Sequence, residues 1–389
     1  AVAALFLTNG ALFANLIPRY PQIKADLGLG ESTYGLALAA FPTGAIAAGL
    51  AAGVLVRRLG SARLAVLGTI LTGVCVLAAA SAPTLWGFAV ALFLAGAMDA
   101  LTDVAQNAHG LRVQRRYGRS ILNSFHAVWS IGAVTGGVMA AGAIALDLPR
   151  QIHLSLSAVI FSVVAVVALR WCLPGPETPA VEESASPVAP ASPAPAPERT
   201  RAWLVGTLAA LVLIATAGTV VEDAGNSWAA VYLSGSLNAS AAVAASGFIA
   251  LVGAQFVGRL IGDRCVDRFG QRAVARAGGL LTVVGMGLAL AFPSVPGTVL
   301  GFAAAGLGVA TLVPAAMHAA DELPGLRPGT GLTVVSWLMR MGFLLSPPII
   351  GVIAESTSVR WGLGLVPAVG LVVIVFSGVL GGRREPSRS

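Results

Sequence analysis

The chain has 389 residues, of which 56% are hydrophobic and 11% are charged, and its net charge is +7. Soluble domains carry charge on about a quarter of their residues, so this composition excludes a soluble enzyme and a secreted disulfide scaffold and indicates a membrane protein. The basic residues lie at the ends of apolar segments, which argues against a nucleic-acid-binding surface.

Twelve apolar segments are predicted to be membrane-spanning helices, because about 20 apolar residues are needed to cross a bilayer. Six precede and six follow residues 173–200, a proline-rich segment predicted to be an extended linker between residues 1–172 and residues 201–389. The first segment is interpreted as a spanning helix rather than a cleaved leader. In chain order, the predicted helices cover residues 1–17, 32–56, 64–82, 85–109, 120–146, 151–172, 202–233, 239–262, 274–292, 297–319, 329–354 and 359–381.

The two sets of six segments match at a nearly constant offset of 210 residues. The glycine pairs that show this offset are Gly60 and Gly270, Gly96 and Gly306, and Gly132 and Gly342. Two parallel six-helix repeats joined by a tether are typical of alternating-access carriers, which hold their solute between the halves. We therefore predict an all-α integral membrane fold of two pseudo-symmetric six-helix bundles.

Lysine and arginine are distributed unequally between the two sides of this arrangement. The connectors on one side contain eighteen, whereas those on the other side contain four, namely Arg19, Lys24, Arg150 and Arg360. Because basic connectors stay in the cytoplasm, both termini and the linker are predicted there, in a multi-pass protein of the inner (plasma) membrane. The only lysine, Lys24, falls outside the cytoplasm, which excludes a lysine-dependent phosphate-binding loop and an intramembrane Schiff base.

The connectors that follow the second helix of each set share a pattern rich in glycine and arginine. The first copy contains Gly53, Arg57, Arg58 and Gly60, and the second contains Asp267, Arg268, Gly270 and Arg272. Both copies resemble the signature loop of the major facilitator superfamily, G-x-x-x-D-R-x-G-x-R, in which an Asp and an Arg tie neighbouring helix ends together. The first copy has Arg57 where the family has Asp, so this loop is interpreted either as such a tie or as a basic connector that only sets orientation.

Longer matches lie at residues 19–29, 103–107, 118–132 and 222–233. These segments resemble the fucose-permease-like branch of the superfamily, particularly its rhizopine-transporter-type members, and the resemblance covers both halves of the chain. It implies proton-coupled movement of a polar, sugar-like solute. One departure is that fucose permease has an acid in its first helix, whereas this chain has only Asn9 and Asn15 there.

Three polar residues of the fourth predicted helix share one face. Asp99, Asp103 and Asn107 are spaced at i, i+4 and i+8. Insertion of one Asp or Arg at a helix centre costs about 2.5 to 3.5 kcal/mol, so each such residue indicates a function or a partner. His126 on the fifth helix lies at a depth near that of Asp103, which makes the pair a candidate for proton transfer. The alternative is a structural hydrogen bond between the two helices.

Arg340 enters the eleventh predicted helix at a depth close to that of Asp99. In one interpretation it pairs with Asp99 across the two halves and releases it when a proton or an anionic solute arrives. In the other, its guanidinium is satisfied within its own half.

The seventh predicted helix ends in side chains suited to a sugar, because carboxylates and amides bind hydroxyls and a flat ring forms an apolar wall. These are Glu222, Asn226 and Trp228, with Glu222 favoured over Asp223, which is expected to face water. The alternative is an outer gate covered by aromatic rings at the headgroup level. Trp129 and Trp337, on equivalent helices of the two halves, are candidates for the cavity wall or for packing between helices.

Together these features predict a transporter that imports a small polar solute, sugar- or cyclitol-like, with protons. Asp103 or Asp99 takes the proton, and Asn107 joins the residues of the seventh helix in binding the solute. A proton-coupled exporter of drugs or metabolites is the alternative, although the fifth helix lacks the Gly-Pro pair of the drug-antiporter signature. A membrane enzyme and a receptor are disfavoured, because neither a nucleophile–base pattern nor a signalling domain is evident. No cofactor and no metal site are expected, and the expected state is a monomer in the lipid bilayer.

Overall fold

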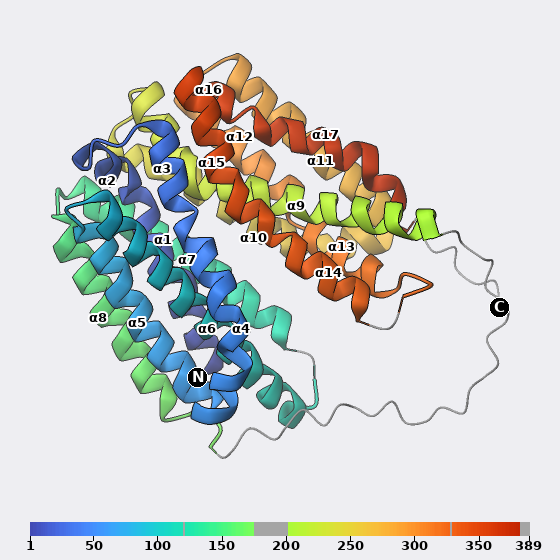
Figure 1. Cartoon of the computed structure of the whole chain (residues 1–389), viewed down its shortest axis with the longest axis horizontal. Helices are drawn as coiled ribbons and strands as arrows, with labels where there is room; N and C mark the ends of the chain where they lie inside the picture. Colours follow the sequence, from blue (N-terminus) through green and yellow to red (C-terminus); the bar gives the residue numbers. More distant parts are fainter. Residues whose placement is uncertain (120, 175–200, 327–328, 382–389) are drawn as a thin grey trace.

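The computed structural model describes residues 1–119, 121–174, 201–326 and 329–381, and this part of the chain contains helices and no strand (Figure 1). Twelve helical spans in it are long and apolar enough to cross a membrane. The predicted all-α fold with twelve spans is therefore confirmed. Nearly all of the predicted linker, residues 173–200, lies outside the described residues.

Each half of the chain provides six of these spans, some of which consist of consecutive helical segments. The first half contains α1 (Val2–Leu16), η1 (Ile17–Arg19), α2 (Tyr20–Asp26), α3 (Glu31–Leu38), α4 (Ala40–Leu59), α5 (Ser61–Ser81), α6 (Leu85–Tyr117), α7 (Leu122–Ala145) and α8 (Arg150–Leu169). The second half contains α9 (Arg201–Val231), η2 (Tyr232–Ser236), α10 (Ala241–Phe269), α11 (Gln271–Ala291), α12 (Val295–Val309), α13 (Leu312–Asp321), α14 (Thr330–Leu338), α15 (Arg340–Ser356), α16 (Val359–Gly362), α17 (Leu365–Phe376) and η3 (Ser377–Val379).

Three spans extend by seven or more residues beyond their predicted bounds, namely the first, the fourth and the eighth, whose helix α10 continues to Phe269 instead of ending at residue 262. The first continues through η1 and α2, because Pro18 and Pro21 lie in the first turns of these segments, where a missing N–H is tolerated. The fourth continues to Tyr117, because the basic sequence after the apolar run remains helical. It ends at Gly118, whose φ of 73° is the left-handed conformation typical of a helix end.

The offset of 210 residues reappears in the packing of the helices. A Cβ atom on Gly96 of α6 would lie 1.9 Å from the carbonyl oxygen of Phe41 in α4. A Cβ atom on Gly306 of α12 would lie 2.1 Å from the carbonyl oxygen of Leu251 in α10, and Leu251 is also 210 residues beyond Phe41. The same close approach of two backbones therefore occurs at corresponding places in both halves.

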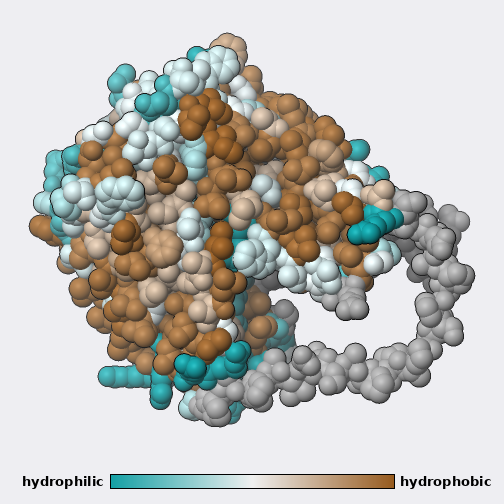
Figure 2. All heavy atoms as spheres, viewed as in Figure 1, coloured by the Kyte–Doolittle hydropathy of each residue, from teal (hydrophilic) through white to brown (hydrophobic). Residues whose placement is uncertain are grey.

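The two halves meet at one end of the molecule and separate at the other. We call the end that carries the arginine-rich connectors the basic face and the other end the opposite face. At the opposite face α3 packs along α15, and the Tyr34 hydroxyl donates a hydrogen bond to the carbonyl oxygen of Ser227 at 2.7 Å. Toward the basic face, α14 packs against α9, α13 and α15 of its own half, and a gap divides the halves (Figure 1). In Figure 2 the outer surface is predominantly hydrophobic, and it is indented between the two halves at the same end of the molecule. The structure is therefore open toward the basic face.

Candidate functional site

A hydrogen-bonded cluster joins three helices of the first half at the level of Asp99. The amide nitrogen of Asn9 in α1 donates to Asp99 Oδ1 in α6 at 2.7 Å. The indole nitrogen of Trp129 in α7 donates to Asn9 Oδ1 at 2.8 Å. Asn9 thus satisfies both the carboxylate and the indole, and it fixes the positions of two predicted site residues.

Asp103 lies one turn further along α6 and is bound by two amides of its own helix. Asn107 Nδ2 donates to Asp103 Oδ1 at 3.0 Å, and Gln106 Nε2 lies 3.4 Å from the same oxygen. Gln106 Nε2 also lies 3.4 Å from Asn9 Oδ1, so the two carboxylates belong to one network. Within the residues that the structure describes, neither Asp99 nor Asp103 forms an ion pair. The first half therefore contains two acids whose hydrogen-bond donors are neutral amides.

The two cations considered as partners of these acids form no ion pair with them among the described residues, although both act electrostatically on Asp103. The His126 ring packs edge-on against Phe6, with the centroids 5.3 Å apart, and forms no hydrogen bond with Asp103 among the described side chains. Arg340 is exposed at the start of α15, and no ion pair with Asp99 is formed within the described part of the chain. The Asp99–Arg340 pair of the first interpretation is not formed here, because Asp99 is bound by Asn9 and the halves are separated toward the basic face.

In the second half, a carboxylate of α9 contacts an amide and a guanidinium of α10. Gln255 Nε2 donates to Glu222 Oε2 at 2.8 Å, and an Arg259 guanidinium nitrogen lies 3.8 Å from the same oxygen. Arg259 also lies 3.4 Å from the hydroxyl of Ser130 in α7, so it bridges the two halves. Arg259 and Gln255 were not among the predicted site residues. The sequence signal that could have identified Arg259 is that a charged residue lies inside the apolar stretch at 239–262.

The remaining residues of the predicted solute site occupy different surroundings. Asn226 is partly buried, and its Oδ1 has no hydrogen-bond partner among the described residues. Trp228 is completely buried, with its ring perpendicular to that of Tyr34 at 5.1 Å, so it does not line an open cavity in this conformation. Trp337 is 46% exposed.

The expectation that Asp223 faces water is wrong. Its exposed fraction is only 8%, whereas the side chain of Glu222 is 20% exposed and pairs with Arg259. Consecutive residues of an α-helix point about 100° apart. The two acids therefore face different surroundings, and the rotation of α9 decides which of them is covered.

The sequence matches a known protein family over almost its whole length. A family model described as Major Facilitator Superfamily matches residues 2–265 and 223–389. The chain belongs to the major facilitator superfamily. It is 30% identical over 381 residues to the uncharacterized transporter y4wD of Sinorhizobium fredii, and the alignment covers 97% of each chain. The superfamily indicated by the signature loop is thereby confirmed.

Solved structures of transporters share the fold. The crystal structure of a mutant of the nucleoside transporter NupG superposes with a TM-score of 0.75 at 10% identity and covers 98% of this chain and 99% of its own. That of a D-xylose-proton symporter superposes with a TM-score of 0.72 at 15% identity and covers 97% and 95%. At this level of identity the similarity establishes the architecture.

The two copies of the superfamily signature loop adopt one backbone conformation. Gly60 and Gly270 have φ angles of 85° and 84°, which only glycine adopts readily, and each ends one helix and begins the next. In the second copy, Arg272 donates to the carbonyl oxygen of Gly378 at 2.7 Å and to that of Leu380 at 3.3 Å. Arg272 therefore ties α11 to the end of the last span. The other loop residues, Gly53, Arg57, Arg58, Asp267 and Arg268, are exposed.

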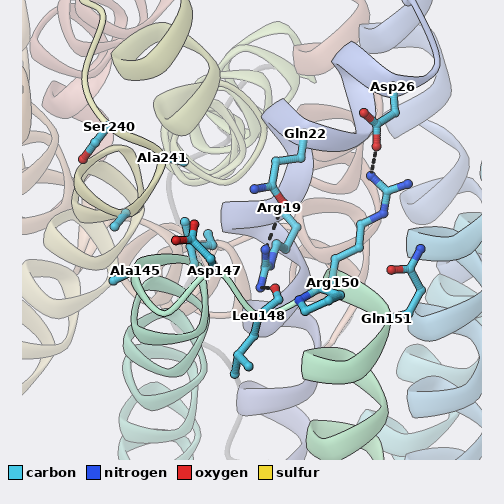
Figure 3. Close-up of a pocket in the computed structure, with 13 residues that line it drawn as sticks. Arg19, Gln22, Asp26, Ala145, Asp147, Leu148, Arg150, Gln151, Ser240 and Ala241 are labelled. Atoms are coloured by element: carbon cyan, nitrogen blue, oxygen red, sulfur yellow. Dashed lines mark hydrogen bonds and ion pairs between the residues drawn. The ribbon is translucent and has the colours of Figure 1, made fainter.

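A separate polar pocket of about 780 Å³ lies at the opposite face (Figure 3). Arg19 donates there to the side-chain oxygen of Gln22 at 3.0 Å and to the carbonyl oxygen of Leu148 at 2.9 Å, and Arg150 pairs with Asp26. These contacts join the end of the first span to the connector before α8. The pocket is lined by none of the acids of the central cluster.

Proposed function

We propose that this member of the superfamily is a secondary transporter that works by alternating access and takes up a small polar solute, sugar- or cyclitol-like, together with protons. The observation that carries the proposal is the network around Asp99 and Asp103, in which two acids inside a membrane span are held by amides and form no ion pair with any described residue. Acids inside a membrane span that form no ion pair are typical of proton pathways, because a proton can then neutralise their charge.

The composition of the surrounding wall supports a polar solute. The first half provides Asn9, Asn107 and Trp129, and the second half provides Glu222 and Asn226. Amides and carboxylates donate to and accept from hydroxyls, and an indole ring gives a flat apolar surface. A lipophilic cation, the expected cargo of a drug exporter, would leave most of these groups without partners. The nucleoside and D-xylose named for the two solved structures are also rich in hydroxyls.

The direction of opening follows from the charges. Connectors rich in arginine remain in the cytoplasm, so we assign the basic face to the cytoplasm and the opposite face to the outside. Both termini then lie in the cytoplasm of a cell with this protein in its inner membrane, and the structure is the inward-open state of a monomer. In the cycle, solute and protons enter from the outside, the halves rock about the site, and both are released inward.

The test begins with a ligand screen by thermal unfolding of the purified protein at two pH values, against neutral sugars, cyclitols, amino sugars and lipophilic cations. A ligand at 100 times its dissociation constant adds about 2.7 kcal/mol of stability, which is readily measured. Stabilisation by a polar solute is expected, and it should be stronger at low pH. Stabilisation by lipophilic cations alone would contradict the proposal.

Proton coupling is then measured in proteoliposomes with a pH-sensitive dye inside. Addition of the solute outside should acidify the lumen, and Asp103→Asn should abolish this signal while solute binding persists, because an amide resembles the neutral acid but releases no proton. The control is Asp263→Asn, which neutralises an exposed acid on α10 and should leave the signal unchanged. An unaltered proton signal in Asp103→Asn would remove this residue from the coupling mechanism.

A further inference from the structure

Asp223 is a buried acid that the proposed transport cycle has not used. It lies near the opposite face, and only 8% of its surface is exposed. Its Oδ1 accepts a hydrogen bond from the Ser227 hydroxyl at 3.1 Å, whereas its Oδ2 is buried and has no hydrogen-bond partner among the described residues. A carboxylate oxygen sealed from water without a donor is unfavourable, because nothing replaces its lost hydration.

The surroundings of Asp223 offer no positive charge. The titratable groups around it are Tyr20 of α2, Tyr34 of α3 and its neighbour Glu222, and from α15 the hydroxyl of Ser346 approaches. All of these are neutral or acidic. Trp228 Nε1 is also buried without a partner among the described residues, so the polar groups sealed at this face are incompletely hydrogen-bonded in the closed form.

The cover over Asp223 comes from the other half of the molecule. Tyr34 of α3 donates to the backbone of Ser227, and its ring packs against Trp228, so it closes the enclosure that contains Asp223. Tyr20 packs edge-on against Tyr34 at 6.2 Å and completes the aromatic group. These contacts join the two halves, so they must break when the opposite face opens. The burial of Asp223 therefore belongs to the closed form of this face.

We propose that Asp223 is a proton-binding site of the gate at the opposite face, separate from Asp99 and Asp103. The gate closes over Asp223 when the acid is neutral, and loss of the proton favours the open gate, in which water solvates the carboxylate. Closure should therefore be favoured at low pH and lost as the pH rises. This inference concerns the gate alone and does not require that solute transport be coupled to protons.

The opening of this face is measured on the full-length protein by the distance between two spin labels. Trp86→Cys and Phe292→Cys place one label on each half near the opposite face, at exposed positions away from the gate, after Cys75, Cys172 and Cys265 have been replaced by serine. The short-distance population should predominate at low pH and give way to a longer distance above a midpoint pH. Identical distance distributions at every pH would overturn the proposal.

The decisive variant is Asp223→Asn, which makes the side chain permanently neutral. It should hold the short distance at all pH values and so remove the transition. The matched control is Asp147→Asn, because Asp147 is an exposed acid in the connector between α7 and α8 at the same face, and the midpoint of this variant should stay at the wild-type value. A wild-type midpoint in Asp223→Asn would refute the proposal.

Two further measurements separate this gate from other causes. Asp223→Glu keeps a titratable group, so it should retain a pH-dependent transition with a shifted midpoint, and it replaces the asparagine variant if that variant fails to fold. Solute-driven proton uptake is measured on the same proteins. If Asp103→Asn loses uptake while Asp223→Asn keeps the wild-type distance transition, the gate proposal fails and the proposed transport function stands.

Discussion

The glycine contacts that recur after 210 residues make a quantitative prediction about stability. Gly96→Ala adds a Cβ atom 1.9 Å from the carbonyl oxygen of Phe41. A carbon and an oxygen that are not bonded need roughly 3.2 Å, so α4 and α6 would have to move apart by about 1.3 Å. The obstructing atom is part of a helix backbone, so it has no side-chain rotation by which to avoid the new methyl group.

The magnitude follows from two opposing effects. Overpacking of a tight contact costs about 1–3 kcal/mol, and a rigid backbone obstacle places this site near 3. Replacing glycine by alanine inside a helix returns about 1 kcal/mol through helix propensity. The net loss should be roughly 2 kcal/mol. Gly306→Ala, with its 2.1 Å contact to Leu251, should lose a similar amount.

The assay compares thermal unfolding of the purified variants in one detergent. The control is Gly287→Ala in α11, where a Cβ atom would meet nothing within 4 Å, and this change should be neutral or slightly stabilising. Because the two tight contacts lie in different halves, the losses of Gly96→Ala and Gly306→Ala should add in the double variant. If Gly96→Ala is as stable as Gly287→Ala, the close approach of α4 and α6 is wrong.

Two further predictions concern charged groups. Arg259→Gln leaves Glu222 with Gln255 alone. A partly exposed pair at 3.8 Å contributes at most about 1 kcal/mol, so thermal unfolding should show a loss of stability of about that size or less, and wild-type stability would show that the pair contributes nothing. Arg272→Ala removes the donor to two carbonyl groups at the end of the last span, so hydrogen exchange at residues 377–381 should accelerate. The exposed Arg264→Ala serves as its control, and equal exchange in both variants would show that Arg272 does not tie the two helices together.

The fold was predictable from the sequence because each span buries its backbone bonds within itself and needs an apolar run of nearly fixed length. Twelve such runs and an internal offset were sufficient to predict two six-helix bundles. The bounds were less predictable where the helix leaves the apolar region. The basic end of α6 remains helical up to Gly118, although hydropathy alone ends the predicted helix at residue 109.

The site was predictable in its residue types and less so in its pairings. Asp99, Asp103 and Asn107 share a face through helix periodicity alone, and the structure places them in one network. The partner of Asp99 is Asn9, 90 residues away in the sequence, whereas the sequence offered Arg340 as a partner in one of two interpretations. Spacing within a helix is encoded locally, whereas a partner on another helix depends on helix rotation and on the conformational state.

Glu222 and Asp223 show how strongly helix rotation determines the surroundings of adjacent side chains. Both acids are adjacent on α9, yet Glu222 meets Gln255 and Arg259, and Asp223 is sealed beneath Tyr34 and Ser227. Hydrophobic periodicity fixes rotation only when one face of a helix is polar, and α9 is apolar over most of its length. The charge of Glu222 is compensated by an arginine and that of Asp223 is not. We therefore assign the proposed proton-binding role to Asp223 and not to Glu222: Glu222 has Gln255 and Arg259 beside it, whereas no described cation compensates the charge of Asp223 beneath the closed opposite face.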